Sequence, residues 1–290
     1  MTTAVSRPAG LPKRSLPRGR PGTWLVWACV VFFLVNLFTL ILSVVVNSFG
    51  TKWFAGWLPQ GFTGSWYSDA WDEFALGDVL TVTLEITLVV VALALLVGVP
   101  AGYALARRDF PGKRIVMFLL LLPVLLPPIT YGIPLATVLY KVHLAGTMTG
   151  VVAANLVPAL PFVILVMTPF VEQIDTNVES AARMCGARTR QVFTRVLVPL
   201  LLPGILAAGI LVLVRTVAMF ELTFLVADAD SQTLIVALYS AAFTPGIRAA
   251  QAIDAMAVIY MALSAVLLII ALMFVNPTQI VAQVREAPAE

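Results

Sequence analysis

The sequence predicts an all-α polytopic membrane protein with six transmembrane helices and both termini in the cytoplasm. Its residues are 60% hydrophobic and only 11% charged, whereas soluble domains carry about 25% charged residues. Its apolar stretches are long enough to cross a bilayer, and its Lys and Arg residues gather in alternate connections. A soluble domain of this size cannot bury so much apolar surface, so we expect a polytopic membrane protein.

Six apolar stretches reach the roughly 20 residues that a membrane-spanning helix requires. The expected spans are Trp24–Val46, Val79–Ala106, Ile115–Tyr140, Thr149–Val171, Leu200–Val226 and Ala252–Val275. The third and fourth spans contain several prolines, which kink membrane helices where protein or water lines the break. These two spans therefore predict either a translocation path with a flexing gate or ordinary proline kinks in a bundle.

The basic residues decide the orientation. Of the 18 Lys and Arg, 14 fall on one side of the predicted spans and three on the other, with Arg215 inside a span. Because basic residues are enriched in cytoplasmic connections, the richer side is the cytoplasm. The net charge of +3 thus reflects membrane orientation and does not indicate a nucleic-acid partner.

Four regions follow from this arrangement. Residues 1–23 form a basic, proline-containing tail, which we expect to be disordered in the cytoplasm. Residues 24–78 hold the first transmembrane helix and an aromatic outer loop, residues 79–275 the transmembrane domain, and residues 276–290 a cytoplasmic tail. The aromatic rings of the outer loop suit the headgroup layer of the lipid bilayer.

The most informative polar stretch lies between the fourth and fifth spans. Thr176 and Glu179 have the spacing of a capping box that starts a helix. Gly186 can adopt the left-handed conformation that ends such a helix. A second short helix is expected from Thr189, and Pro199 marks the entry to the next span. This stretch therefore predicts a folded helix–turn–helix on the cytoplasmic side.

The same stretch resembles the "EAA" loop of type I ABC importer permeases, which have the MetI-like fold. Its matching positions are Ala181, Ala182, Gly186, Val196 and Pro199. Ser180 occupies the acidic first position of that motif, Glu179 lies one residue early, and Val198 replaces a leucine. The resemblance implies a coupling helix that docks into a separate ATPase. The residues it assigns to coupling are Glu179, Ser180, Ala181, Ala182, Arg183, Gly186 and Pro199.

The resemblance also implies partners. They are two ATP-binding subunits, a second permease or a second copy of this chain, and an extracytoplasmic solute-binding protein. The sequence has no Gly-x-x-x-x-Gly-Lys-Ser/Thr motif for cradling phosphates. We therefore expect no enzymatic activity in this chain and no bound cofactor, with ATP and Mg²⁺ used by the partner ATPase. A single histidine, His143, predicts no metal site.

Three shorter stretches of the sequence bear on the identity of the substrate. Within the family, the sequence is similar to the polyamine and ferric-iron branch at 104–107, 158–162 and 220–240. This similarity implies a polyamine-like substrate. Sugars, phosphonates and iron remain as alternatives.

The charged residues inside the predicted spans include Glu85, Arg215 and Glu221. Charges within the membrane often mark an ion or proton path, so an ion-coupled secondary transporter or a channel remains as an alternative function. At 1.5 Å per residue, Glu85 lies roughly 9 Å and Arg215 roughly 14 Å below the outer surface. We therefore expect a Glu85–Arg215 pair beside the translocation path, with Glu221 turned away on the helix of Arg215.

Overall fold

The computed structural model describes residues 21–53, 58–244 and 249–274. The described residues are helical apart from turns and one isolated bridge between Gly50 and Phe62. Of the predicted basic tail, only residues 21–23 are described, as the start of the first helix. The rest of that tail and the predicted tail at 276–290 lie outside the described residues.

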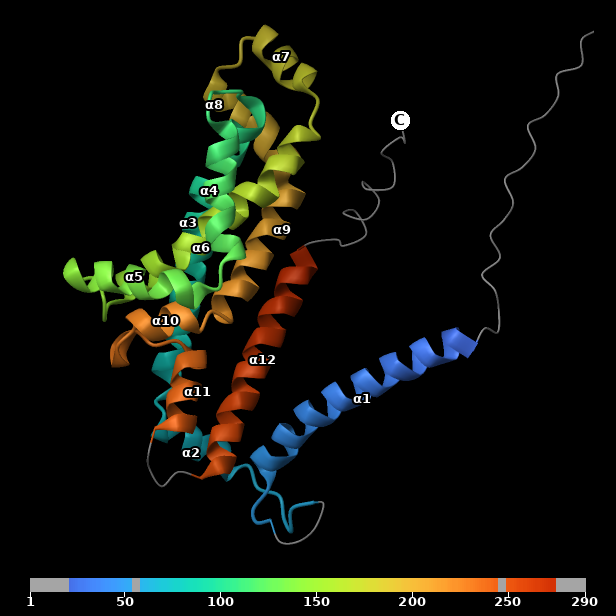
Figure 1. The fold of residues 1–290 in the computed structure, drawn as a ribbon, viewed down its shortest axis with the longest axis vertical. Coiled ribbons are helices and arrows are strands. Elements are labelled where there is room, and N and C mark those ends of the chain that lie inside the picture. The colour runs from blue at the N-terminus through green and yellow to red at the C-terminus, as the bar shows by residue number, and fades with distance from the viewer. Residues whose placement is uncertain (1–20, 54–57, 245–248, 275–290) are drawn as a thin grey trace, which may run out of the picture.

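Figure 1 shows an elongated helical body from which one long helix diverges. The elements are α1 Pro21–Phe49, α2 Ser65–Glu73, α3 Leu76–Arg107, α4 Lys113–Leu125, α5 Pro128–Lys141, α6 Met148–Glu172, α7 Thr176–Met184, α8 Thr189–Gln191, the π-helical turn η1 Val192–Leu197, α9 Val198–Val217, α10 Glu221–Val226, the 3₁₀ turn η2 Ala229–Ser231, α11 Leu234–Phe243 and α12 Ala250–Phe274. Five helical segments of the described chain are long and apolar enough to cross a membrane, or six if α4 and α5 form one bent span. The short helix α2 lies in the predicted aromatic outer loop.

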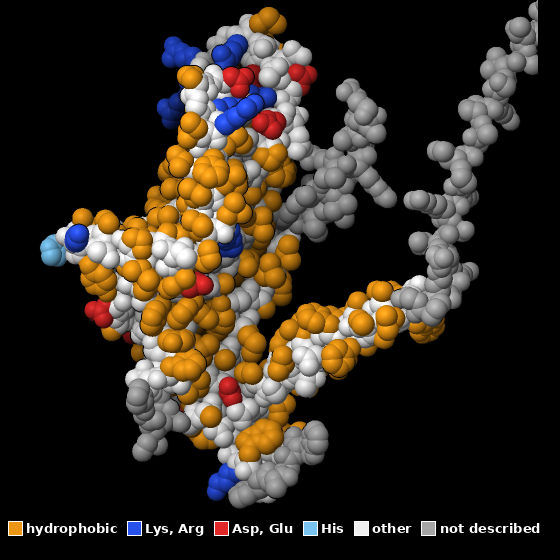
Figure 2. All heavy atoms as spheres, in the orientation of Figure 1, with side chains coloured by type: hydrophobic (Ala, Val, Ile, Leu, Met, Phe, Trp, Pro, Cys, Tyr) orange, Lys and Arg blue, Asp and Glu red, His pale blue; other side chains and the backbone are white. Residues whose placement is uncertain are grey.

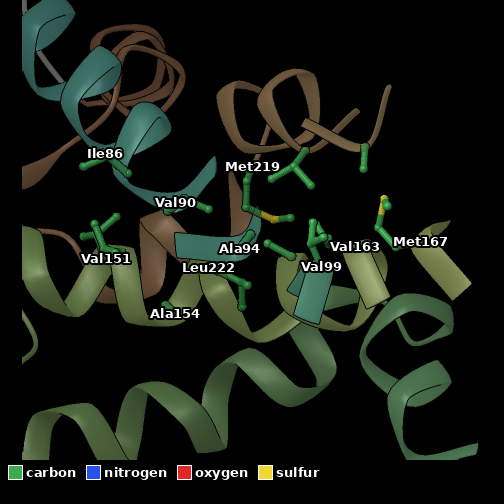
Figure 3. Close-up of a cluster of buried hydrophobic side chains, with 14 of the residues drawn as sticks. Ile86, Val90, Ala94, Val99, Val151, Ala154, Val163, Met167, Met219 and Leu222 are labelled. Atoms are coloured by element: carbon green, nitrogen blue, oxygen red, sulfur yellow. The ribbon is translucent and has the colours of Figure 1, made fainter. Parts of the chain in front are cut away.

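The centre of the body is the pairing of α3 with α6. A Cβ atom added at Gly98 would lie 2.6 Å from Val163 Cγ1, and one added at Gly102 would lie 3.0 Å from Met167 Cβ. These two glycines, one turn apart, let the backbones approach as small residues do between membrane helices. A core of buried apolar side chains surrounds this contact (Figure 3).

The helix α1 diverges from this body (Figure 1) and exposes almost all of its apolar side chains within the isolated chain. It is attached at its C-terminal end, where it packs against α12. There Asn47 Nδ2 donates a hydrogen bond to Asp254, and Ser48 Oγ lies 2.8 Å from the Tyr67 hydroxyl on α2. The attachment of α1 is therefore polar and confined to one end.

The predicted third span is not one kinked helix. Its two halves, α4 and α5, meet at 100° (Figure 1). The break falls at Leu126 and Pro127, before Pro128, which begins α5. Two successive prolines lack N–H donors, and the residue before a proline is restricted to extended backbone. Leu126 accordingly has φ −76° and ψ 142°.

The predicted fifth span also differs from the structure. α9 ends at Val217, and Glu221 begins the separate helix α10. Residues 227–251, which separate the predicted fifth and sixth spans, contain the apolar helix α11, which packs on α12 and α3. Leu234 N, at the start of α11, donates a hydrogen bond to Thr83 Oγ1 at 2.8 Å. Burial against α3 and α12 explains why this stretch folds as a helix.

The close approach of α3 and α6 gives a test of the fold. Replacing Gly98 with leucine should destabilise the helical body by about 1–3 kcal/mol, the usual cost of overpacking a tight contact. The measurement is the thermal unfolding midpoint of the purified protein in detergent, followed by fluorescence-detected size exclusion. The neighbouring Val97 is 53% exposed, so Val97→Leu is the matched control and should leave the midpoint unchanged. Equal midpoints for both variants would contradict the close packing of α3 on α6 at Gly98.

Candidate functional site

The predicted helix–turn–helix is present at one end of the body, as α7 followed by α8 (Figure 1). Its cap differs from the prediction, because Asp175 and not Thr176 caps α7, accepting a hydrogen bond from Asn177 N at 2.9 Å. Gly186 ends the helix with φ +83°, as the sequence predicts. Gly186 N donates to Arg183 O at 2.9 Å, and Ala187 N donates to Ala182 O at 3.1 Å.

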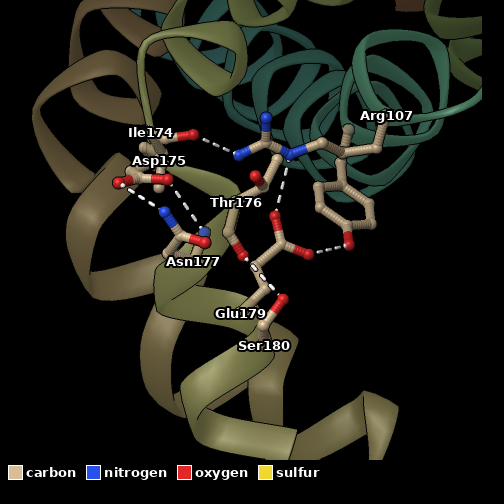
Figure 4. A network of polar contacts seen from close by, with 8 residues as sticks. Arg107, Ile174, Asp175, Thr176, Asn177, Glu179 and Ser180 are labelled. Carbon is tan, nitrogen blue, oxygen red and sulfur yellow. Dashed lines mark hydrogen bonds and ion pairs between the residues drawn. The ribbon is translucent and has the colours of Figure 1, made fainter.

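Glu179 does not reach back to the helix start as a capping box requires. Its side chain turns inward, toward the end of α3, and is buried (Figure 4). Oε1 accepts a hydrogen bond from Arg107 Nε at 2.8 Å, and Oε2 accepts one from the Tyr103 hydroxyl at 2.7 Å. Arg107 also donates to Ile174 O. Glu179 therefore fixes α7 to α3 and is not part of the exposed face of α7.

The sequence interpretation missed Tyr103 and Arg107. Both lie on the last turns of α3, four residues apart, so their side chains share one helix face. The sequence signal for Arg107 is its position at the predicted cytoplasmic end of a span, which contributed to the predicted orientation and to the similarity at 104–107 but to no contact. An arginine and a buried carboxylate form a charge-assisted hydrogen bond, which is stronger than a neutral one.

The exposed face of α7 carries small residues, an arginine and two larger apolar side chains, one of which is Val178 at 39% exposed. Ser180, Ala181 and Arg183 are exposed, and Met184 at the end of the helix is 86% exposed. Ala182 is half-buried and packs against the core. Among the residues that the resemblance assigns to coupling, Glu179 is buried and Ala182 is half-buried. The others are exposed, namely Ser180, Ala181, Arg183, Gly186 and Pro199. Met184 was not singled out from the sequence.

The second half of this segment is continuous with α9. α8, η1 and α9 together form one helical rod from Thr189 to Val217, so Pro199 does not begin a new helix. Phe193 packs edge-on against Tyr103 with ring centroids 5.6 Å apart. Arg188, Arg190 and Arg195 are exposed, and Figure 2 shows basic side chains gathered at this end of the molecule.

In the described part of the chain, Glu85, Arg215 and Glu221 form no ion pair with one another. Glu85 is exposed on α3, while Arg215 on α9 and Glu221 on α10 are half-buried. Within the described residues, Glu85 and Arg215 form no ion pair; the Arg215 guanidinium lies over the Phe162 ring instead, 4.9 Å from its centroid. The expected geometry assumed one continuous helix through residue 226, and the break after Val217 removes that assumption.

A small cavity lies beside Arg215, between α6 and α9. The polar groups that line it come from Asn155, Arg215 and Thr216, and its apolar walls include Phe162 and Met219. Asn155 is 2% exposed, and its Oδ1 has no hydrogen-bond partner among the residues that the structure describes. Among the described residues there is no group of three His, Cys, Asp or Glu side chains that could hold a metal ion.

Comparison with known proteins identifies the family. Residues 98–280 match the family described as "Binding-protein-dependent transport system inner membrane component". The chain is 36% identical over 132 residues to the trehalose transport system permease protein SugB of Mycobacterium tuberculosis, covering 46% of this chain and 48% of that protein. It is 33% identical over 174 residues to the molybdate/tungstate permease protein WtpB of Thermococcus kodakarensis, covering 59% and 68%. A probable molybdenum ABC transporter permease of Haloferax volcanii is 32% identical, covering 68% and 74%.

Solved structures agree on the fold. A bacterial ABC transporter that imports the acidic polysaccharide alginate has a chain of the same fold, with a TM-score of 0.69 at 18% identity, covering 89% of this chain and 98% of that chain. The MetNI methionine ABC transporter gives 0.57 at 20% identity, covering 68% and 95%. The three relatives named above are permeases for trehalose, for molybdate or tungstate and for molybdenum, and none of the three is named for a polyamine or for iron. The chain belongs to the binding-protein-dependent ABC transporter permeases of the MetI-like type, multi-pass inner-membrane components that are not themselves catalytic and that work with a separate ATPase.

Proposed function

We propose that this chain forms half of a translocation path with a second permease and is coupled to its ATPase through residues 176–199. The observation that carries the proposal is the anchoring of α7. Its inward face is fixed to α3 by Glu179, and its outward face presents the apolar side chains of Val178 and Met184. An exposed apolar side chain on a rigidly held helix suits insertion into a cleft of a partner protein.

The anchoring also supports a mechanism of coupling. A displacement of α7 by a docked ATPase would act on α3 through the Glu179–Arg107 ion pair. The same displacement would act on α9, because α8, η1 and α9 form one rod. Coupling between distant sites requires rigid elements that have two discrete arrangements. The spans α3 and α9, both connected to α7, would meet that requirement.

For the substrate, the relatives favour sugars or oxyanions over polyamines. Those described above are named for trehalose, molybdate and tungstate. A related structure is of an alginate ABC transporter in complex with a pentasaccharide-bound periplasmic protein. We propose that this chain likewise receives its substrate from a solute-binding protein, at the end of the molecule opposite α7. An ion-coupled transporter is disfavoured because the chain belongs to an ATPase-dependent family.

The proposed orientation predicts which positions are accessible from outside. In a variant with Cys29→Ser and Cys185→Ser, single cysteines at positions 60 and 230 should react with a membrane-impermeant maleimide on spheroplasts. Cysteines at 112 and 188 should react only after the cells are permeabilised. The measurement is labelling followed by gel shift. Labelling of position 188 on intact spheroplasts would contradict the docking of an ATPase at α7.

The turn at Gly186 predicts a coupling defect. A Cβ atom there meets no atom within 4 Å, but φ is +83°, so Gly186→Val should cost roughly 1 kcal/mol of backbone strain and redirect α8. We expect the complex to hydrolyse ATP without transport, as measured in proteoliposomes. Gly112 is the matched control, because it has φ +88° and equal space around it in a different turn. Gly112→Val should keep transport coupled; equal effects of both changes would argue against docking at α7.

The buried ion pair predicts a local loss of stability. Arg107→Gln leaves the Glu179 carboxylate buried without its cation, which typically costs about 3–5 kcal/mol. Amide hydrogen exchange across residues 176–184 should accelerate by roughly 100-fold or more, since about 1.4 kcal/mol corresponds to a factor of ten. The exposed pair Lys113–Asp109 provides the control, because Lys113→Gln should leave exchange in α7 unchanged. Unaltered exchange in Arg107→Gln would show that α7 is held by other contacts.

A further inference from the structure

Two open hollows adjoin at the turn between α3 and α4, at the same end of the body as α7. The first, of ≈ 740 Å³, is lined by the end of α3 and by Arg108, Asp109 and Phe110. The second, of ≈ 450 Å³, shares Asp109 and Phe110 and is lined further by the start of α4, including Lys113 and Arg114. We call the pair the α3–α4 hollows. Neither has a part in the contact between α3 and α7.

The hollows lie on another side of α3 from the residues that hold α7. The residues of α3 that line the first hollow have the spacing of one helix face, namely Ala101, Ala104 and Leu105. Tyr103 and Arg107, which bond to Glu179, lie roughly 130° around the helix from that face at 100° per residue. A molecule bound in the hollows would therefore leave the contact with α7 intact.

The side chains of the hollows carry an excess of positive charge. Lys113 Nζ donates to Asp109 Oδ1 at 3.1 Å, and the Asp109 side chain, 99% exposed, points into water. Arg108 and Arg114 are exposed and form no ion pair within the described part of the chain. Two guanidinium groups are thus left without an anion. Because a guanidinium binds a phosphate through two parallel hydrogen bonds, the hollows suit a phosphate group.

The hollows lie where the hydrocarbon of the bilayer meets water. With 32 residues, α3 is about 48 Å long at 1.5 Å per residue, enough to cross the roughly 30 Å hydrocarbon core and end in the headgroup layer. The sequence from Ile115 to Leu125 has no polar side chain. Figure 2 shows the basic side chains of this end next to a band of apolar side chains. A phosphate in the hollows would lie at the depth of lipid headgroups.

An apolar stripe leads away from the hollows along α4. This helix lies wholly within the described residues, and none of its residues is buried. Ile115, Phe118 and Leu119 are 65%, 61% and 55% exposed, and their spacing of three and four residues puts them on one face. Ile115 also lines the second hollow, so the stripe begins at the basic residues. A ligand that matches both features has a phosphate at one end and a hydrocarbon chain at the other.

We propose that the α3–α4 hollows bind an anionic phospholipid from the leaflet on the side of α7. Its phosphate would contact Arg108 and Arg114, and one acyl chain would lie along the stripe from Ile115 to Leu119. A soluble anion would leave the stripe unused, and a zwitterionic lipid carries a cation that the two arginines repel. A partner helix packed on α4 would cover the stripe without supplying the phosphate. Basic pockets at this depth are typical binding places for anionic headgroups.

The bound lipid would act on the end of α3. Arg108 directly follows Arg107, whose side chain is paired with Glu179 of α7. A ligand that binds only the folded form stabilises that form. Lipid in the hollows should therefore stabilise residues 105–114 against local opening, from the side of α3 that α7 does not cover.

The test is lipid retention by the purified protein. The complex is isolated through this chain with the subunits that accompany it. Native mass spectrometry then follows titration with dioleoyl-phosphatidylglycerol or dioleoyl-phosphatidylcholine. We expect tighter retention of phosphatidylglycerol. Arg108→Gln and Arg114→Gln should each weaken it about 5-fold, and both changes together about 30-fold, as the loss of one and two basic residues at a membrane surface does.

Two controls define the site. Arg190 is an exposed arginine at the same end that lines neither hollow, so Arg190→Gln should retain phosphatidylglycerol as the unmodified protein does. Glycerol 3-phosphate, which has the phosphate without acyl chains, should not displace the lipid at equal concentration. Phe118→Ser should weaken retention, because it interrupts the apolar stripe. A second measurement needs no variant: amide hydrogen exchange over 105–114 should be slower in phosphatidylglycerol nanodiscs than in phosphatidylcholine nanodiscs.

Several results would overturn the inference. These are equal retention of the two lipids, full retention by the double arginine variant, an equal loss in Arg190→Gln, and displacement by glycerol 3-phosphate, which would indicate an adventitious ion only. A photo-crosslinker at position 118 that reacts with the partner permease in place of lipid would also overturn it. No measurement here requires a bound ATPase, so a failure of coupling through α7 would count against the proposed function alone.

Discussion

The structure depends on the close approach of α3 and α6 at Gly98 and Gly102. In a bilayer there is little hydrophobic gain from bringing helices together, so tight van der Waals packing must do it. The two helices that pack here also carry the residues that hold α7 and residues that face Arg215. α3 ends in Tyr103 and Arg107, which hold α7. α6 carries Asn155 and Phe162, which face Arg215.

Charged side chains are paired where α7 meets α3 and unpaired around Arg215 within the described residues. At the end of α3, Glu179 and Arg107 form a charge-assisted pair with further hydrogen bonds to Tyr103 and Ile174. Such a satisfied network makes the local structure rigid. Among the described residues, Arg215 on α9 and Glu221 on α10 form no ion pair, and the buried Asn155 Oδ1 has no hydrogen-bond partner. Rigidity at the contact of α7 with α3 suits the transmission of movement.

The sequence predicted the long apolar helices and the turn at Gly186 because both depend on local signals. Length and hydropathy mark a span, and a glycine marks a left-handed turn. The bend at Pro127 and Pro128 was underestimated, because prolines indicate a kink without giving its angle. The helix α11 was not predicted, because its helical state depends on packing against α3 and α12.

The inward direction of Glu179 could not be predicted from its spacing. Its partners lie 72 and 76 residues away in the sequence, so only the tertiary arrangement of α3 and α7 brings them together. The surroundings of Arg215 likewise could not be predicted from sequence spacing. The break after Val217 has no proline to mark it, and without that break Glu221 would continue the helix of Arg215. Long-range contacts, not helix propensity, decide both arrangements.

The π-helical turn η1 sets the direction around the helix axis in which the side chains of α9 point. In this turn Val198 N bonds to Phe193 O, five residues back, so the turn holds one residue more than an α-helical turn. One residue corresponds to about 100° of rotation around a helix axis. The direction in which Arg215 points, measured from α7, is therefore fixed by an insertion some twenty residues earlier in the chain. The π-helical turn therefore sets how the exposed residues of α8 and the cavity-lining Arg215 are oriented relative to one another around the rod.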